Sequence, residues 1–161
     1  MSKDLLSAKN YAYRLIKFRV RSEKEIRDKL KNKEYDPAAI QEVVDFLKKS
    51  RLLDDELFAR LWVQSRIKKP LGPAKLRYEL KLKGIDSDII ENTFRQLQEN
   101  YSEEKVIEEI IRKKMKKMGN IDAEKAKSRL YGFLLRRGYP RNLVVDGLLK
   151  IFKSGTDQES A

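Results

Sequence analysis

The chain has 161 residues, of which 37 are Lys or Arg and 25 are Asp or Glu, so its formal charge at pH 7 is +12. It contains neither cysteine nor histidine, which excludes disulfides, thiolate metal sites and any imidazole-based mechanism. Charged residues make up 39% of the chain and apolar residues 40%, a balance that fits amphipathic helices better than disorder. The positive charge points to a polyanion or an acidic protein surface as partner.

Charged residues interrupt the apolar positions of the first eighteen residues, so this stretch does not resemble a signal peptide. No later apolar run is long enough to cross a bilayer. We therefore expect a cytoplasmic protein with no membrane contact.

Apolar residues recur at identical spacing in three stretches of the chain. The matching positions are Ile26, Leu30, Tyr35, Ile40, Val44 and Leu47; then Leu76, Leu80, Ile85, Ile90, Phe94 and Leu97; then Leu130, Leu134, Tyr139, Val144, Leu148 and Ile151. A pair of packing helices that occurs three times predicts an all-α protein, an elongated tandem array of three three-helix repeats. The predicted repeats are residues 1–52, 53–100 and 101–152, and residues 153–161 are expected to form a disordered tail.

The first repeat carries clear helix start signals. Its first helix is expected to run to about Arg21. Ser22 with Glu25 three residues later is a capping box, so a second helix is predicted from there to near Lys33. Asp36-Pro37 places a side-chain cap before a proline and predicts the start of the third helix.

One turn of the first repeat departs from the pattern. Gly84 and Gly138 follow the second predicted helix of the later repeats, where a glycine readily adopts a left-handed cap. Glu34 occupies the matching position, so this helix either ends by another geometry or places a glutamate in the left-handed region at some cost. We expect this corner to be the less regular one.

In the second repeat the carboxylates of residues 54–56 coincide with a predicted helix start. They could hold a divalent cation, but capping of the helix is the favoured interpretation, since consecutive helical positions do not face one another. Two prolines and a glycine within residues 68–73 predict a loop. A helix through Leu76 and Leu80 follows, and Asp86 or Ser87 is expected to cap the next one.

The third repeat is predicted to begin at Ser102, with acidic residues in the first helical turn and lysines in the last turns. Gly119-Asn120 is expected to end that helix and Asp122 to start the next. Pro140 opens the last helix, which carries Val144, Leu148 and Ile151.

No residue pattern predicts catalysis, a cofactor or a bound metal. Ser65 near Lys68 is a possible nucleophile pair, but nothing supplies an oxyanion hole or a strained turn. The glycines are scattered as helix stops and form no phosphate-binding loop. We expect a protein that is not an enzyme.

The basic residues are the candidate binding groups. One group flanks the predicted proline-glycine loop, which we expect to be exposed because its backbone must be solvated. The other group lies away from the apolar stripe of residues 106–111. The candidates are Arg66, Lys68, Lys69 and Lys75 in the first group, and Lys113, Lys116 and Lys117 in the second. Such runs are often only solvated helix faces, but the unbalanced charge of the whole chain favours a role in binding.

The sequence also resembles the bacterial RecX family. The resemblance is carried by the stretch Leu53-Asp54-Asp55-Glu56-Leu57-Phe58-Ala59, then Gly72, Leu76, Glu79-Leu80, Lys83-Gly84-Ile85 and Ile89-Ile90, and by Ser22-Glu23-Lys24-Glu25-Ile26 to Leu30 in the first repeat. It extends from about Tyr11 to Phe152, and its specificity comes from the joint spacing of these pieces. RecX proteins are similar in size, in basic charge and in their three-helix repeats.

The resemblance implies a regulator that binds the RecA recombinase filament on single-stranded DNA. It would inhibit ATP hydrolysis, strand exchange and co-protease activity, with no catalytic motif. Independently of the resemblance, we expect a monomer. The main alternative is a module that binds nucleic acid directly and without sequence preference, as small basic helical units can. A scaffold for another acidic protein is a third interpretation and an enzyme a fourth.

Overall fold

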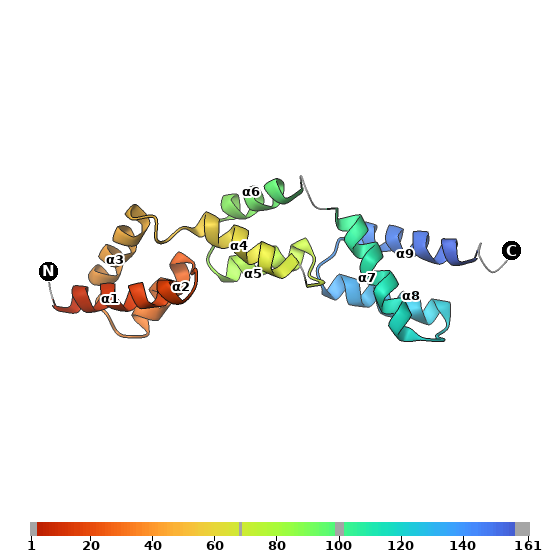
Figure 1. The fold of residues 1–161 in the computed structure, drawn as a ribbon, viewed down its shortest axis with the longest axis horizontal. Coiled ribbons are helices and arrows are strands. Elements are labelled where there is room, and N and C mark those ends of the chain that lie inside the picture. The colour runs from red at the N-terminus through yellow and green to blue at the C-terminus, as the bar shows by residue number, and fades with distance from the viewer. Residues whose placement is uncertain (1–2, 68, 99–101, 157–161) are drawn as a thin grey trace. The chain divides into compact units, whose positions relative to one another are not determined.

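The computed structural model describes residues 3–67, 69–98 and 102–156, and all regular elements within these residues are α-helices (Figure 1). The helices are α1 (Lys3–Phe18), α2 (Glu23–Lys31), α3 (Pro37–Lys49), α4 (Asp55–Ile67), α5 (Pro73–Leu82), α6 (Ser87–Gln98), α7 (Glu103–Met118), α8 (Ala123–Arg136) and α9 (Arg141–Thr156). They form three successive groups of three. The predicted all-α architecture of three three-helix repeats is confirmed.

The chain divides into two compact units, and the division passes through the second repeat. Unit 1 contains the residues up to 64 together with 79–93. Unit 2 contains 65–78 together with the residues from 94 onward. Each unit is described by itself below.

The repeated apolar positions form the cores. Sixteen of the eighteen positions predicted from the repeat are buried, and Tyr35 and Leu97 are half-buried. In unit 1, α1 packs against α2 and α3 around a core that includes Leu30 and Val44. In unit 2, α7 packs against α8 and α9 around Ile107 and Leu134. Burial of these side chains is the main term that favours folding, at about 25 cal/mol per Å² of apolar surface.

Side-chain caps begin the helices where the sequence predicts them. Ser22, Asp36, Ser102 and Asp122 each accept a hydrogen bond from a backbone N–H two or three residues later. Several helix ends differ from the predictions. Helix α1 ends at Phe18 and α2 at Lys31, both earlier than expected. Helix α9 continues to Thr156, past the predicted tail boundary, and residues 157–161 lie outside the described residues.

The turn after the second helix of each repeat has one geometry in all three repeats. Glu34, Gly84 and Gly138 have φ values of 58°, 76° and 86°. The N–H of the following residue donates to the carbonyl five residues earlier, at 3.3 Å from Tyr35 to Leu30 and 3.1 Å from Ile85 to Leu80, with the same bond in the third repeat. The expectation of a less regular corner at Glu34 is therefore wrong. Glutamate adopts the left-handed conformation at this helix end, where glycine is the usual residue.

Glycine is needed in the later repeats because another repeat packs against the turn. A Cβ on Gly84 would lie 2.6 Å from the Cβ of Lys24, in the first repeat. A Cβ on Gly138 would lie 2.6 Å from the backbone nitrogen of Lys75, in the second repeat. Glu34 is exposed. Positive φ alone therefore permits a side chain, whereas the close approach between repeats does not.

The loop between α4 and α5 takes part in the contact between the second and third repeats at Gly138. Gly72 N–H donates to Arg137 C=O at 2.8 Å, and Ala74 N–H donates to Gly138 C=O at 3.2 Å. Leu71, Gly72 and Pro73 are buried. The expectation of an exposed loop is wrong for these three residues. The Arg137 carbonyl of the third repeat accepts the Gly72 N–H, Leu71 N–H donates to Lys69 C=O at 2.7 Å, and Pro73 has no N–H.

Replacing Gly72 with alanine should break this junction. The new Cβ would lie 2.4 Å from the carbonyl carbon and oxygen of Gly138, and both atoms belong to the backbone and cannot rotate away. We expect a loss of roughly 1–3 kcal/mol in the free energy of unfolding, measured by urea denaturation. We also expect faster hydrogen exchange at the Gly72 and Ala74 amides.

Gly132→Ala is the matched control. Its Cβ would meet only the flexible tip of Arg136, at 3.1 Å, in the interior of α8. This variant should gain about 0.5–1 kcal/mol, as alanine usually does over glycine in a helix. Equal stability of the two variants would contradict the junction described here.

Candidate partner-binding surface

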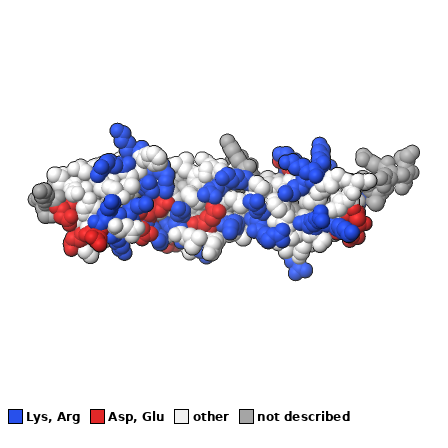
Figure 2. Space-filling model, turned by 90° about the horizontal axis from the view of Figure 1, so that it is seen from below, with Lys and Arg blue, Asp and Glu red and all other residues white. Residues whose placement is uncertain are grey.

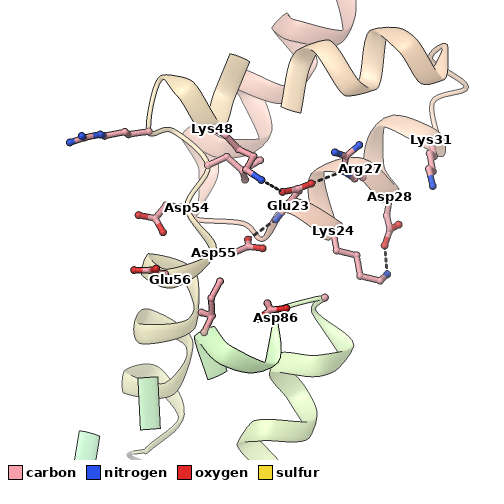
Figure 3. Close-up of a pocket in the computed structure, with 14 residues that line it drawn as sticks. Glu23, Lys24, Arg27, Asp28, Lys31, Lys48, Asp54, Asp55, Glu56 and Asp86 are labelled. Atoms are coloured by element: carbon pink, nitrogen blue, oxygen red, sulfur yellow. Dashed lines mark hydrogen bonds and ion pairs between the residues drawn. The ribbon is translucent and has the colours of Figure 1, made fainter. Parts of the chain in front are cut away.

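A polar cleft of about 860 Å³ lies in unit 1, lined by α2 along its length, by the end of α3 and by the starts of α4 and α6 (Figure 3). Six carboxylates and five cations line it. Figure 3 shows Lys48 and Arg27 on either side of the Glu23 carboxylate. Each of the two cations lies 2.8 Å from a Glu23 oxygen. Lys24 and Asp28 form a further pair at 2.6 Å, so part of the charge that lines the cleft is neutralised within it.

Glu23 also connects the first repeat to the second through its backbone. Its N–H donates to Asp55 Oδ1 at 2.8 Å, so a carboxylate at the start of α4 caps α2. Burial raises the pKa of Glu23, but the hydrogen bonds from Lys48 and Arg27 outweigh it and leave the pKa lowered. Burial likewise raises the pKa of Asp55, and there the single backbone hydrogen bond does not offset it.

A second set of contacts lies at the same junction. Ser22 is fully buried, and its hydroxyl donates to Lys83 C=O at 2.7 Å while accepting from Glu25 N–H. Glu25 forms ion pairs with Arg19 at 2.9 Å and with Lys83 at 2.6 Å. Burial raises the pKa of Glu25, but the hydrogen bonds and charges of Arg19 and Lys83 lower it to about 2. These groups join the first repeat to the turn that follows α5.

The carboxylates of residues 54–56 serve helix starts, as the sequence predicts. Asp54 Oδ1 accepts from Leu57 N–H at 2.9 Å, and Asp55 caps α2 as described above. Within residues 3–67, 69–98 and 102–156, no three acidic side chains are grouped so that they could hold a metal ion. The bond from Glu23 N–H to Asp55 makes this cleft part of the contact between the first two repeats.

The candidate cations that the structure describes all lie in unit 2. Arg66 is half-buried near the end of α4, Lys69 is exposed in the following loop, and Lys75 is exposed in α5. Lys68 lies outside the described residues. Lys113, Lys116 and Lys117 are exposed on α7. The two predicted groups thus occupy separate elements of one unit.

The candidates differ in how far their charge is already neutralised. Lys113 pairs with Glu109 at 2.5 Å. Lys69, Lys116 and Lys117 have no carboxylate partner among the residues that the structure describes. Unpaired, exposed ammonium groups are the ones that a phosphate or carboxylate of a partner can engage without first breaking an internal ion pair. These three are the stronger candidates on this ground.

Sequence analysis missed two cations that link the two groups. The Arg137 guanidinium carbon lies 5.2 Å from the centroid of the Phe133 ring, and Lys114 Nζ lies 4.0 Å from it. The Arg137 carbonyl accepts the hydrogen bond from Gly72 in the loop. The loop and α7 are therefore connected through the turn after α8. We name Lys69, Lys75, Lys114, Lys116, Lys117 and Arg137 the basic surface.

An aromatic residue adjoins this surface. Tyr78 is 56% exposed, and Lys75 Nζ lies 5.6 Å from its ring centroid. An exposed ring beside a cation is typical of surfaces on which nucleic acid bases stack. The sequence could have predicted this pairing, because Tyr78 follows Lys75 by three residues and therefore lies on the same side of α5.

The charge of the third repeat is visible in Figure 2. In the part of the view occupied by α7 to α9, Lys and Arg side chains outnumber Asp and Glu. Residues 102–153 contain 14 Lys and Arg and 7 Asp and Glu. This part of unit 2 therefore presents a positive potential to a partner.

In the part of the chain covered by the structure, none of the helices combines the length and the apolar character that crossing a bilayer requires.

Comparison with known proteins identifies relatives across all three repeats. Profiles described as the first, second and third three-helix domains of RecX match residues 8–47, 54–93 and 102–146. A regulatory protein RecX from Amycolatopsis mediterranei is 34% identical over 137 residues, which cover 84% of this chain and 78% of that protein. A regulatory protein RecX from Clostridium acetobutylicum is 36% identical over 152 residues, covering 91% and 70%.

Solved structures show the same fold. The crystal structure of RecX from Lactobacillus salivarius superimposes with a TM-score of 0.82 at 19% identity, covering 93% of this chain and 97% of that chain. A second structure of a regulatory protein RecX gives a TM-score of 0.76 at 19% identity. At this identity the likeness concerns the fold alone.

The ion pairs of Glu25 should make stability depend on pH. Because its folded pKa of about 2 lies below the ordinary 4.5, the pairs stabilise the fold fully above about pH 4.5 and progressively less as pH falls toward 2. Glu25→Gln should lower the free energy of unfolding by roughly 1.5–3 kcal/mol at pH 7.

This difference between Glu25→Gln and the unaltered protein, measured by urea denaturation, should shrink below pH 4.5. Glu42→Gln is the control, because Glu42 is exposed and lies 3.8 Å from Lys9. A Glu25→Gln effect that stays constant from pH 7 to pH 2.5 would show that the carboxylate charge is not its cause.

Proposed function

We propose that this chain, which belongs to the RecX family, acts as a regulator of a RecA-type recombinase. Relatives over most of its length bear the name regulatory protein RecX. More specifically, we propose that the protein binds the recombinase filament on single-stranded DNA. There it inhibits ATP hydrolysis, strand exchange and co-protease activity, as a cytoplasmic monomer without catalytic activity of its own.

The observation that carries the proposal is the unpaired cationic surface on a repeat protein of this family. Lys69, Lys116 and Lys117 are exposed and have no carboxylate partner among the described residues. A nucleoprotein filament offers phosphates and acidic side chains in a regular array. Such a surface gains Coulomb energy at each contact and loses it as salt screens the charges.

The repeat organisation explains how modest contacts can suffice. Three similar modules on one chain can engage several filament subunits, and after the first contact the others form at a high effective concentration. A protein held in this way would obstruct duplex DNA and substrate proteins. It would also resist relative movement of neighbouring subunits during nucleotide turnover, which is a route to lower ATPase activity.

Charge reversal on α7 tests this proposal. Lys116→Glu combined with Lys117→Glu should raise the concentration needed for half-maximal inhibition of filament ATPase by about tenfold or more. Each reversal removes an attractive charge contact and adds a repulsive one, and each of these effects contributes roughly 1 kcal/mol or less to the binding free energy. Thermal unfolding should stay nearly unchanged, because both side chains are exposed.

The matched control reverses two exposed lysines of the first repeat, Lys29 and Lys33. It changes the net charge by the same amount, so it separates a local contact from a general loss of positive charge. Equal loss of inhibition in both double variants would mean that only net charge matters. Full inhibition by the α7 variant would remove the basic surface from the proposal.

Direct binding of nucleic acid is the second candidate function, and Tyr78 beside Lys75 favours it. Stacking of a base on an exposed aromatic ring contributes about 1–3 kcal/mol and tolerates any base. Under this alternative the protein would bind bare single-stranded DNA as well as it binds the filament. Tyr78 would then contribute to affinity in the absence of any recombinase.

Affinities for bare single-stranded DNA, duplex DNA and the assembled filament, measured in one buffer, separate the two functions. The proposed function predicts tightest binding to the filament, and all three affinities should fall as salt rises. Tyr78→Ser should weaken binding to single-stranded DNA by about fivefold or more if the ring stacks on bases. Equal affinity for all three ligands would favour the second candidate.

A further inference from the structure

An apolar groove lies between α8 and α9 in the third repeat. Its volume is about 300 Å³, and Tyr131 and Ser128 from α8 and Val145, Leu148 and Leu149 from α9 line most of it. Val145 is 37% exposed and Leu149 48% exposed. The volume is at the lower end for a ligand pocket and suits a few side chains of a protein segment.

Comparison of the repeats within this chain shows that these apolar residues are not required by the fold. The positions of Tyr131, Val145 and Leu149 correspond to Arg27, Gln41 and Asp45 in the first repeat, and to Arg77, Glu91 and Arg95 in the second. Arg27 donates to Gln41 at 3.0 Å, and Gln41 donates to Asp45 at 2.9 Å. Two repeats therefore place polar side chains on this face.

The exchange of all three positions for apolar residues leaves hydrophobic surface in water, which costs free energy unless something covers it. Val145 and Leu149 are exposed and lie outside the core, whose buried positions on the same helix include Val144 and Leu148, while Tyr131 is half-buried and packs against the core from one side. The apolar groove is therefore a feature of the outer face of this repeat.

The charges around the groove indicate what covers it. Arg141 lies one helical turn before Val145, and Lys125 lies one turn before Ser128. The chain runs in opposite directions in α8 and α9 (Figure 1), so these two cations, which do not line the groove themselves, lie near opposite ends of the residues that do. Both are exposed, and neither has a carboxylate partner among the residues in the described ranges. Lys127 and Glu124, at the rim, pair with each other at 2.7 Å.

We infer that this groove docks a short amphipathic segment of a partner protein, with two apolar side chains one helical turn apart and carboxylates at both ends. The apolar side chains would cover Val145, Leu149 and Tyr131, and the carboxylates would meet Arg141 and Lys125. This site is separate from the basic surface and needs no DNA. A helix that docks in a groove of this kind contacts it through apolar side chains at positions i and i+4.

A designed peptide tests the inference on the full chain, without recombinase or DNA. The probe is a short helical peptide with two central leucines four residues apart and two glutamates at each end. Its controls replace the leucines with serines, or the glutamates with lysines. We expect the acidic leucine peptide to bind with a dissociation constant below about 1 mM and to shift amide resonances near residues 128–131 and 145–149.

A triple variant, Tyr131→Arg with Val145→Gln and Leu149→Asp, introduces the side chains of the first repeat, which fold in that setting. It should weaken binding of the acidic leucine peptide by about tenfold or more. Arg141→Glu combined with Lys125→Glu should weaken it by about fivefold or more. Leu82→Gln, which removes an exposed leucine elsewhere, should leave it unchanged.

Three outcomes would overturn the inference. The first is no binding of the acidic leucine peptide below millimolar concentration. The second is that the lysine-flanked peptide binds as tightly as the acidic leucine peptide, or that the triple variant binds the acidic leucine peptide as tightly as the unaltered protein does. The third is self-association of the unaltered protein that the triple variant abolishes in sedimentation, because the groove would then be covered by a second copy of this chain. None of these measurements uses filament inhibition, so their failure leaves the proposed function open to its own tests.

Discussion

The close contact between successive repeats is the constraint on which the rest of this structure depends. The start of the second helix in one repeat meets the turn after the second helix of the next. In unit 1, Ser22 bonds to the Lys83 carbonyl and Lys24 packs on Gly84. In unit 2, Gly72 bonds to the Arg137 carbonyl and Lys75 packs on Gly138. A small repeat with a modest core of its own gains from such neighbour contacts, as repeat proteins generally do.

The two junctions use different chemistry for the same contact. The first is surrounded by ion pairs of Glu23 and Glu25, whose lowered pKa values show that the surrounding cations stabilise the charged carboxylates. The second relies on backbone hydrogen bonds and on the absence of a side chain at Gly72. Carboxylates at the first junction are thus paired with cations of the same unit, whereas Lys69, Lys116 and Lys117 of unit 2 have no carboxylate partner among the described residues.

Packing and the proposed binding involve different faces of the third repeat. The buried face keeps the apolar spacing shared by all repeats, and the outer face differs from both of the others at Tyr131, Val145 and Leu149. Together with Arg137 and Lys114 on Phe133, these residues give unit 2 two kinds of surface, one cationic and one apolar. The function proposed above, recognition of a protein filament on nucleic acid, would use both kinds of contact.

The sequence by itself determined the all-α class, the three repeats, most helix starts and the candidate lysines, because these depend on local periodicity and on side chains that cap their own helix. It also predicted that carboxylates of residues 54–56 cap the helix that starts there, which the bond from Leu57 N–H to Asp54 confirms for Asp54. It did not determine that Glu34 repeats the glycine geometry, that Leu71 to Pro73 are buried, or that Asp55 caps α2 rather than its own helix. Nor did it predict that Arg137 and Lys114 both lie against the Phe133 ring. Only the tertiary structure decided these. Asp55 meets Glu23 thirty-two residues away, the loop meets the Arg137 carbonyl of another repeat, and Lys114 reaches Phe133 from another helix, and local spacing does not say which distant groups will meet. The Glu34 turn is local, but the sequence left its left-handed geometry as one of two alternatives.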